Sequence, residues 1–205
     1  MKLSNTNFYK RHNLELERYL ASEEALHIIN INSKEKISEN LSEKLYVEID
    51  ETKDLSTKFN GKKYKTVILT DVVEVVGDIY KLFSEIKHLL DANGKLIITS
   101  LNTKYYLIIK LLEMLKLKER NKKFSYIHNK KINNVASGLG FEFVNTISKQ
   151  IFPFKLLGIG IVLNKILEIL LFKFNFGIKT YSVFRFKKIN IKKSKKTIII
   201  PAKNE

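Results

Sequence analysis

Three short apolar runs, rich in aliphatic residues, place the strongest constraint on the fold of this chain. They are ALHIINI, YKTVILTD and KLIITS, at residues 25–31, 64–71 and 95–100. Runs of this length with a continuous apolar centre are typical of strands that are covered on both faces of a sheet. We therefore expect a sheet that lies between two layers of helices.

The segments around these runs alternate between helical and strand patterns. Apolar spacing predicts helices at residues 14–23, 33–41, 78–90 and 104–117, and a further helix that ends at Gly138 or Gly140. Asn93-Gly94 is a signal that ends the third of these helices. Further strands are predicted at residues 44–50, 141–148 and 179–188. This alternation is typical of a Rossmann-like, doubly wound α/β domain with a mostly parallel sheet.

Length and composition limit the number of domains and the kinds of site. A chain of 205 residues that is 44% hydrophobic can form one domain with a full core. It has no cysteine, which excludes disulfides and cysteine-ligated metals and fits a reducing cytoplasm. Its four histidines lack the spacing of metal ligands; they are His12, His27, His88 and His128. We therefore expect one domain without a metal site.

The chain is strongly basic, with a formal net charge of +16. Such a charge favours polyanionic partners such as nucleic acid or an anionic membrane surface. Of the 37 basic residues, however, only Arg11, Arg18, Arg120 and Arg185 are arginine, the residue on which base and phosphate recognition mainly relies. A solvated lysine surface is therefore the preferred interpretation, and no nucleic-acid partner is expected.

The most apolar stretch, residues 151–176, does not have the pattern of a membrane-spanning helix. Charged residues interrupt it too often, namely Lys155, Lys165, Glu168 and Lys173. Its apolar surface fits three alternatives: a helix packed in the core, a face that docks a partner, or an interfacial helix on a membrane. Because the first residues lack the apolar run of a signal peptide, we expect a cytoplasmic protein, with peripheral membrane contact as the third alternative.

Residues 70–102, TDVVEVVGDIYKLFSEIKHLLDANGKLIITSLN, resemble the class I S-adenosylmethionine-dependent methyltransferases from their fourth strand through their fifth. Asp71 stands where the family has the acid that closes the fourth strand. Glu74 stands at the glutamate of a frequent Glu-His pair, whose histidine is replaced by Val75. The resemblance implies a sheet with an antiparallel last strand and S-adenosylmethionine as the cofactor. The interval from Asp50 to Tyr64 is too short for the family's usual helix and third strand, so that region is expected to be shortened.

The same resemblance assigns a cofactor site to the ends of the first two strands. The turn after the first strand contains Asn30 and Asn32 where the family has glycines that let the backbone approach the ligand. Asparagine adopts a positive φ more readily than most residues, so these two are the candidates to shape the turn. Asp50 ends the second strand, where the family places an acid on the ribose hydroxyls. The alternative is that Asp50 is one strand-end acid in a loop that also contains Glu51 and Asp54.

Asp71 and Glu74 are predicted to face the crevice at the carboxyl ends of the strands, where open α/β sheets bind ligands. The resemblance makes Asp71 a candidate cofactor residue, and a carboxylate at Glu74 could steer a substrate or act as a base. The alternative role of Glu74 is to stabilise the following helix through its dipole. Whether the domain transfers methyl groups or is a non-catalytic module that kept the fold stays open at this point.

A narrower resemblance concerns the second half of the chain. Residues 110–144 and 151–167 are similar to methyltransferase-like domains fused ahead of family-2 glycosyltransferases in bacterial surface-polysaccharide clusters, and the ending KKTIIIPAKNE resembles the first strand of such a glycosyltransferase. The resemblance implies a methyltransferase-like domain at 1–188, a basic linker at 189–196 and the truncated start of a glycosyltransferase at 197–205. It also implies that the chain is a fragment of a longer protein whose partner is the attached glycosyltransferase.

Overall fold

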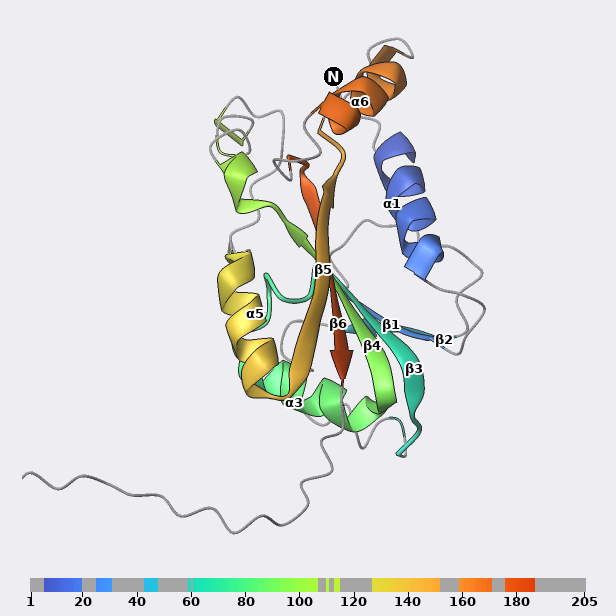
Figure 1. Cartoon of the computed structure of the whole chain (residues 1–205), viewed down its shortest axis with the longest axis vertical. Coiled ribbons are helices and arrows are strands. Elements are labelled where there is room, and N and C mark those ends of the chain that lie inside the picture. The colour runs from blue at the N-terminus through green and yellow to red at the C-terminus, as the bar shows by residue number, and fades with distance from the viewer. Residues whose placement is uncertain are drawn as a thin grey trace, which may run out of the picture.

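The computed structural model describes residues 6–19, 25–30, 43–47, 59, 61–106, 110, 113–114, 127–151, 159–170 and 176–186. Within these residues the chain forms a six-stranded sheet with helices on both faces (Figure 1). The strands are β1 (Ala25–Asn30), β2 (Glu43–Val47), β3 (Tyr64–Thr70), β4 (Leu90–Leu101), β5 (Phe141–Lys149) and β6 (Lys179–Phe186). The helices are α1 (Thr6–Tyr19), α3 (Ile79–Leu89), α5 (Asn129–Gly138) and α6 (Ile159–Leu170), with a short 3-10 helix η1 (Thr103–Tyr105).

The order of the strands across the sheet is β2-β1-β3-β4-β6-β5. The pairs β1 with β2, β1 with β3, and β3 with β4 are parallel, whereas β6 is antiparallel to both β4 and β5. This confirms the predicted α/β, doubly wound and mostly parallel sheet with an antiparallel last strand. The chain passes from β1 outward to β2 and later continues from β3 in the opposite direction, so the topological switch point lies between β1 and β3.

Strands β3, β4 and β6 each contribute to two cores, because successive side chains of a strand point to opposite faces of the sheet. Val67 and Leu69 of β3 belong to the large core beneath α3 and α5, whereas Ile68 between them belongs to a small core beneath α1. The small core contains Leu16, Ile68, Ile97 and Tyr181. Figure 1 shows α3 and α5 together on one face of the sheet and α1 on the other. The continuous apolar runs therefore do mark strands that are covered on both faces.

Helix α3 has the apolar stripe that its sequence predicts. The buried residues of α3 are Ile79, Leu82, Phe83, Ile86 and Leu89. Asp78 caps the helix, and its carboxylate accepts a hydrogen bond from the backbone N–H of Lys81 at 3.0 Å. The helix ends at Leu89 and not at Asn93-Gly94, because β4 already begins at Leu90. Asn93 instead adopts a φ of 66° where the register between β3 and β4 shifts.

Other predicted boundaries differ by several residues or cannot be compared. Helix α1 covers Thr6–Tyr19 and so begins earlier than the predicted 14–23. Strand β2 is described over Glu43–Val47, and residues 48–50 of the predicted strand lie outside the described residues. The predictions for helices at 33–41 and over most of 104–117 lie outside the described residues, as do the linker and the glycosyltransferase-like segment. The described part of α6 lies within the segment 151–176.

The start of β6 depends on a close backbone approach at Gly177. A Cβ at this position would lie 2.6 Å from the carbonyl oxygen of Lys149 and from the carbonyl carbon of Ser148. Gly177→Ala is therefore expected to lower the free energy of unfolding by about 1–3 kcal/mol, measured by urea denaturation. Gly138→Ala at the end of α5 is the matched control, because a Cβ there meets nothing within 4 Å. Equal losses in both variants would contradict the close approach.

Candidate functional site

The edge of the sheet beside the switch point brings together residues from four strands. Asn30 is the last residue of β1, and the pairing of Ile29 with Thr70 places its backbone level with Asp71. On the other side of β3, Leu101 at the end of β4 pairs with Lys179 at the start of β6. Open α/β sheets bind ligands at this edge, beside the switch point, so the described residues Asn30 and Asp71 lie where such a sheet leaves its ligand crevice.

A buried ion pair joins Asp71 to Lys179 at this edge. Asp71 follows β3 with a φ of 54°, and one of its carboxylate oxygens accepts a hydrogen bond from the ammonium group of Lys179. The side chain of Lys179 is 3% exposed and that of Asp71 is 18% exposed. A buried ammonium requires a counter-charge, and Asp71 provides it. Part of the negative charge expected at the crevice is therefore already neutralised by the protein.

Glu74 lies in the turn that follows β3 and is only 2% exposed. Its Oε1 accepts a hydrogen bond from the backbone N–H of Leu101 at 2.7 Å, while its Oε2 has no hydrogen-bond partner among the described residues. Burial, followed by the negative charge of Asp71, raises the pKa of Glu74 to about 8, although Lys179 and the Leu101 N–H act in the opposite direction. Two carboxyl groups thus share one ammonium, and at neutral pH the buried Glu74 carboxyl mostly keeps its proton.

The contacts of Glu74 bear on the two roles considered for it. Asp78 caps α3, whereas the carboxyl group of Glu74 contacts the end of β4. A carboxyl group with a pKa near neutrality has the acid-base strength that proton transfer at physiological pH requires. Glu74 is therefore a candidate proton acceptor, whose Oε1 is held by the Leu101 N–H and whose buried Oε2 has no hydrogen-bond partner among the described residues.

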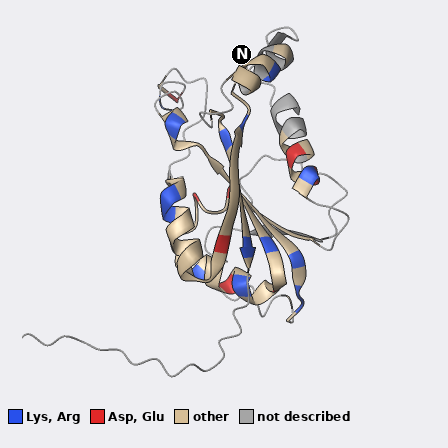
Figure 2. Ribbon diagram, in the orientation of Figure 1, with Lys and Arg blue, Asp and Glu red and all other residues tan. Residues whose placement is uncertain are grey.

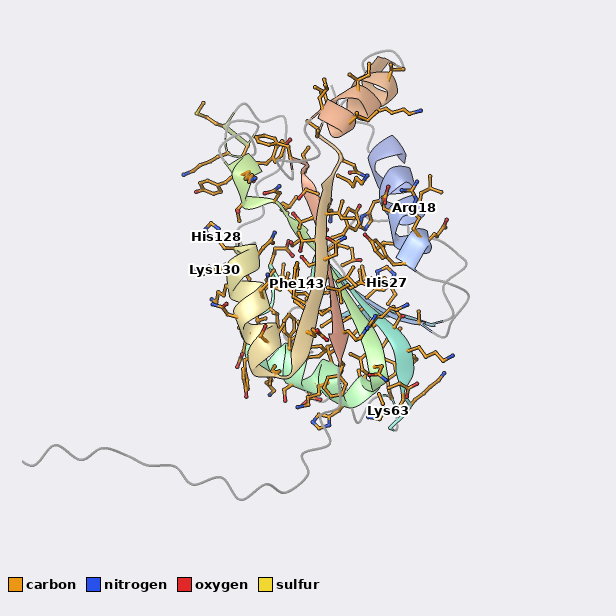
Figure 3. All side chains as sticks on the ribbon, viewed as in Figure 1. Arg18, His27, Lys63, His128, Lys130 and Phe143 are labelled. Atoms are coloured by element: carbon orange, nitrogen blue, oxygen red, sulfur yellow. The ribbon has the colours of Figure 1, made fainter. Side chains whose placement is uncertain are left out.

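The buried histidines on the α1 side of the sheet have structural partners. His27 on β1 forms a hydrogen bond of 2.7 Å with the hydroxyl of Thr70 on β3. His12 on α1 forms one of 2.7 Å with the hydroxyl of Tyr181 on β6. Figure 3 shows His27 at the sheet and His128 on the outer side of α5. Among the described residues no group of histidine, aspartate or glutamate side chains could hold a metal ion.

The structure describes only some of the predicted site residues. It brings Asp71 and Glu74 together and places the backbone of Asn30 at the same edge, but it does not describe the side chain of Asn30. Asn32 and Asp50 lie outside the described residues, so their roles stay predictions. Sequence reasoning missed Lys179. The only local signal is a lysine at the first position of a strand, and a lysine-rich chain contains many similar positions.

Comparisons with known proteins agree with this architecture. The model of a methyltransferase domain family matches residues 10–146, which is more than half of the chain. An S-adenosylmethionine-dependent methyltransferase from Thermotoga maritima, a possible histamine N-methyltransferase, is similar with a TM-score of 0.55 and 12% identity, over 87% of this chain and 89% of that chain.

Two archaeal structures are similar as well. One is a putative methyltransferase from Haloferax volcanii, solved in complex with the Trm112 methyltransferase activator, with a TM-score of 0.55, 11% identity and coverage of 90% of this chain and 94% of that chain. The other is an S-adenosylmethionine-dependent methyltransferase from Archaeoglobus fulgidus, with a TM-score of 0.52, 16% identity and coverage of 87% and 94%. At these identities the structures establish a shared fold. No curated protein matches the chain.

Proposed function

Because the chain belongs to the methyltransferase domain family, whose cofactor is S-adenosylmethionine, we propose that it binds this cofactor beside Asn30 and Asp71. We also propose that it works with a glycosyltransferase in the synthesis of surface polysaccharides or other glycans. One observation carries the cofactor part of the proposal: the ends of β1 and β3 flank the switch point. The location fits the group, since an open α/β sheet leaves its ligand crevice there.

In this proposal each strand end has a separate task. Asn30 and Asn32 shape the turn against the methionine part of the cofactor, Asp50 binds the ribose hydroxyls, and Asp71 lines the crevice. When bound, S-adenosylmethionine supplies an electrophilic methyl group. An acceptor hydroxyl or neutral amine would give up a proton in the course of its methylation. Glu74 is the candidate to take this proton at Oε2, once its own proton has been lost to solvent.

Cofactor binding is the direct test of this proposal. We expect S-adenosylmethionine to release or absorb heat in calorimetry and, at about 100 times its Kd, to stabilise the fold by about 2.7 kcal/mol. Asp50→Ala should weaken binding because it removes the acceptor for the ribose hydroxyls. Asp54→Ala is the matched control, since it removes an equal charge from the same loop. Equal effects of both variants would contradict a specific role for Asp50, and no binding by the wild type would refute the cofactor proposal.

The association with a glycosyltransferase rests on the sequence of the second half of the chain. The ending KKTIIIPAKNE resembles the first strand of a family-2 glycosyltransferase, and the linker before it is rich in lysine, which suits a tether. Both segments lie outside the described residues. The coding sequence downstream of Glu205 tests this part, because a fused transferase requires an Asp-x-Asp type of acidic site farther along the chain.

The ion pair of Lys179 with Asp71 favours a second candidate function. With Lys179 in place, the described carboxyl groups beside the switch point, Asp71 and Glu74, contribute little net negative charge to attract the cationic sulfonium centre of the cofactor. A domain that lost cofactor binding could still position or regulate an attached glycosyltransferase as a non-catalytic module. The calorimetric experiment separates the two functions, because this module shows neither heat nor stabilisation with S-adenosylmethionine.

A further inference from the structure

Helix α6 presents a row of exposed apolar side chains. Val162, Ile166, Ile169 and Leu170 are 58%, 49%, 70% and 67% exposed. The last three lie four, seven and eight residues after Val162, which places all four on one side of the helix. We call these four side chains the α6 stripe. Packing in the core, one of the three alternatives for this segment, is therefore wrong for the α6 stripe.

The position of α6 explains why the sheet does not cover the stripe. Figure 1 shows α6 beyond the carboxyl edge of the sheet, away from the face that α3 and α5 cover. The segment that follows η1 lies at the same end of the molecule, and two of its apolar side chains, Tyr106 and Met114, are also exposed. One end of the protein therefore carries apolar side chains on two separate elements.

Exposed lysines accompany the apolar side chains at this end of the molecule. Lys165 is exposed on α6 and precedes Ile166 of the α6 stripe. Figure 2 shows a basic position on the α6 ribbon. Lys104 and Lys110 are exposed at η1 and in the segment after it, and Lys104 lies over the ring of Phe176, 5.5 Å from its centroid. Lysine can bury its aliphatic stem beside apolar groups while its ammonium reaches lipid phosphates. A helix with an apolar side and flanking lysines has the chemistry of an interfacial membrane helix.

We propose that α6 binds the surface of an anionic membrane, with the α6 stripe in the boundary between headgroups and acyl chains and Lys165 beside the lipid phosphates. Among the described residues no helix is long and apolar enough to cross a bilayer, and α6 itself has only 12 residues. An anionic surface suits the net charge of +16, whereas a second copy of the chain would bring an equal charge against the same end. The inference does not depend on cofactor binding.

Sedimentation of the full chain with lipid vesicles tests this proposal. We expect binding to vesicles of phosphatidylcholine and phosphatidylglycerol, and much weaker binding to phosphatidylcholine alone. The double variant Ile169→Glu/Leu170→Glu should lower partitioning by at least about tenfold, because two buried aliphatic side chains are lost from the interface. Tyr80→Glu is the control, since Tyr80 is 59% exposed on α3 at the other end of the molecule.

The charge contribution has its own pair of variants. Lys165→Glu should weaken binding to anionic vesicles more than Lys130→Glu, which makes the same charge change at an exposed position on α5 (Figure 3). The proposal is overturned if the double variant binds as well as the wild type, or if Tyr80→Glu loses as much binding. It is also overturned if the wild type does not bind anionic vesicles. If the wild type instead forms a dimer that the double variant dissociates, a second copy of the chain covers α6.

Discussion

Lys179→Met is expected to lower the free energy of unfolding by about 3–5 kcal/mol, because it leaves the Asp71 carboxylate without its counter-charge. Lys179 is the ammonium that contacts Asp71, and Glu74 lies close enough for both charges to affect its pKa. Methionine retains much of the length and apolar surface of lysine, so the loss reports the charge more than the packing. Chemical denaturation at pH 7 measures the difference.

Two further variants separate the ion pair from other causes. Lys179→Met/Asp71→Asn removes both charges and should recover a large part of the loss, since no uncompensated carboxylate remains at Asp71. Lys131→Met, at an exposed position on α5, should change stability by no more than about 0.5 kcal/mol. If the double variant is as unstable as Lys179→Met, packing around Lys179 accounts for the loss and the ion-pair interpretation fails.

Glu74→Gln is expected to change how stability depends on pH. The pKa of Glu74 rises from 4.5 to about 8 on folding, so the folded state holds a proton that the unfolded state has lost between these values. The contribution of Glu74 to stability is therefore full below about pH 4.5 and declines as the pH rises through about 8, by a total on the order of 3–5 kcal/mol. Glutamine imitates the protonated carboxyl and removes this decline.

The measurement is the free energy of unfolding of both proteins from pH 4 to pH 9. The stability of the variant relative to the wild type should increase across this window, with most of the change above pH 5. Glu142→Gln on β5, where the side chain is exposed, should show no comparable trend. If the free energy of unfolding depends on pH in the same way for the wild type and for Glu74→Gln, then Glu74 does not retain its proton in the folded protein.

Much of the sheet could be predicted because its signals are local. The apolar centres of residues 25–30, 64–70 and 95–100 identify central strands, and the apolar stripe of residues 79–89 identifies a helix packed on them. The edge of the sheet at which Asp71 and Glu74 lie could also be predicted, because the carboxyl ends of parallel strands meet at one edge. Boundaries were less certain: Asn93-Gly94 is a turn signal that fits both a helix end and the irregular start of β4.

The contacts that give the site its charge could not be predicted. Lys179 is 108 residues from Asp71 in the chain, and it reaches the crevice because antiparallel β6 starts at the edge where β3 and β4 end. A one-residue change of that register would point Lys179 to the other face of the sheet. The pKa of Glu74 depends on the same long-range packing, because burial is its first cause and Asp71 its second.

The sequence by itself determined the α/β class and the edge of the sheet at which a ligand would bind, because apolar periodicity and the alternation of helices and strands are local properties of the chain. The family followed from the resemblance that residues 70–102 carry. Only the tertiary structure decided that a lysine neutralises the acids at that edge and that α6 presents its apolar side to the outside. An amphipathic pattern is the same whether its apolar side meets a sheet or a lipid surface. The position of the helix relative to the sheet makes the difference, and distant parts of the chain set that position.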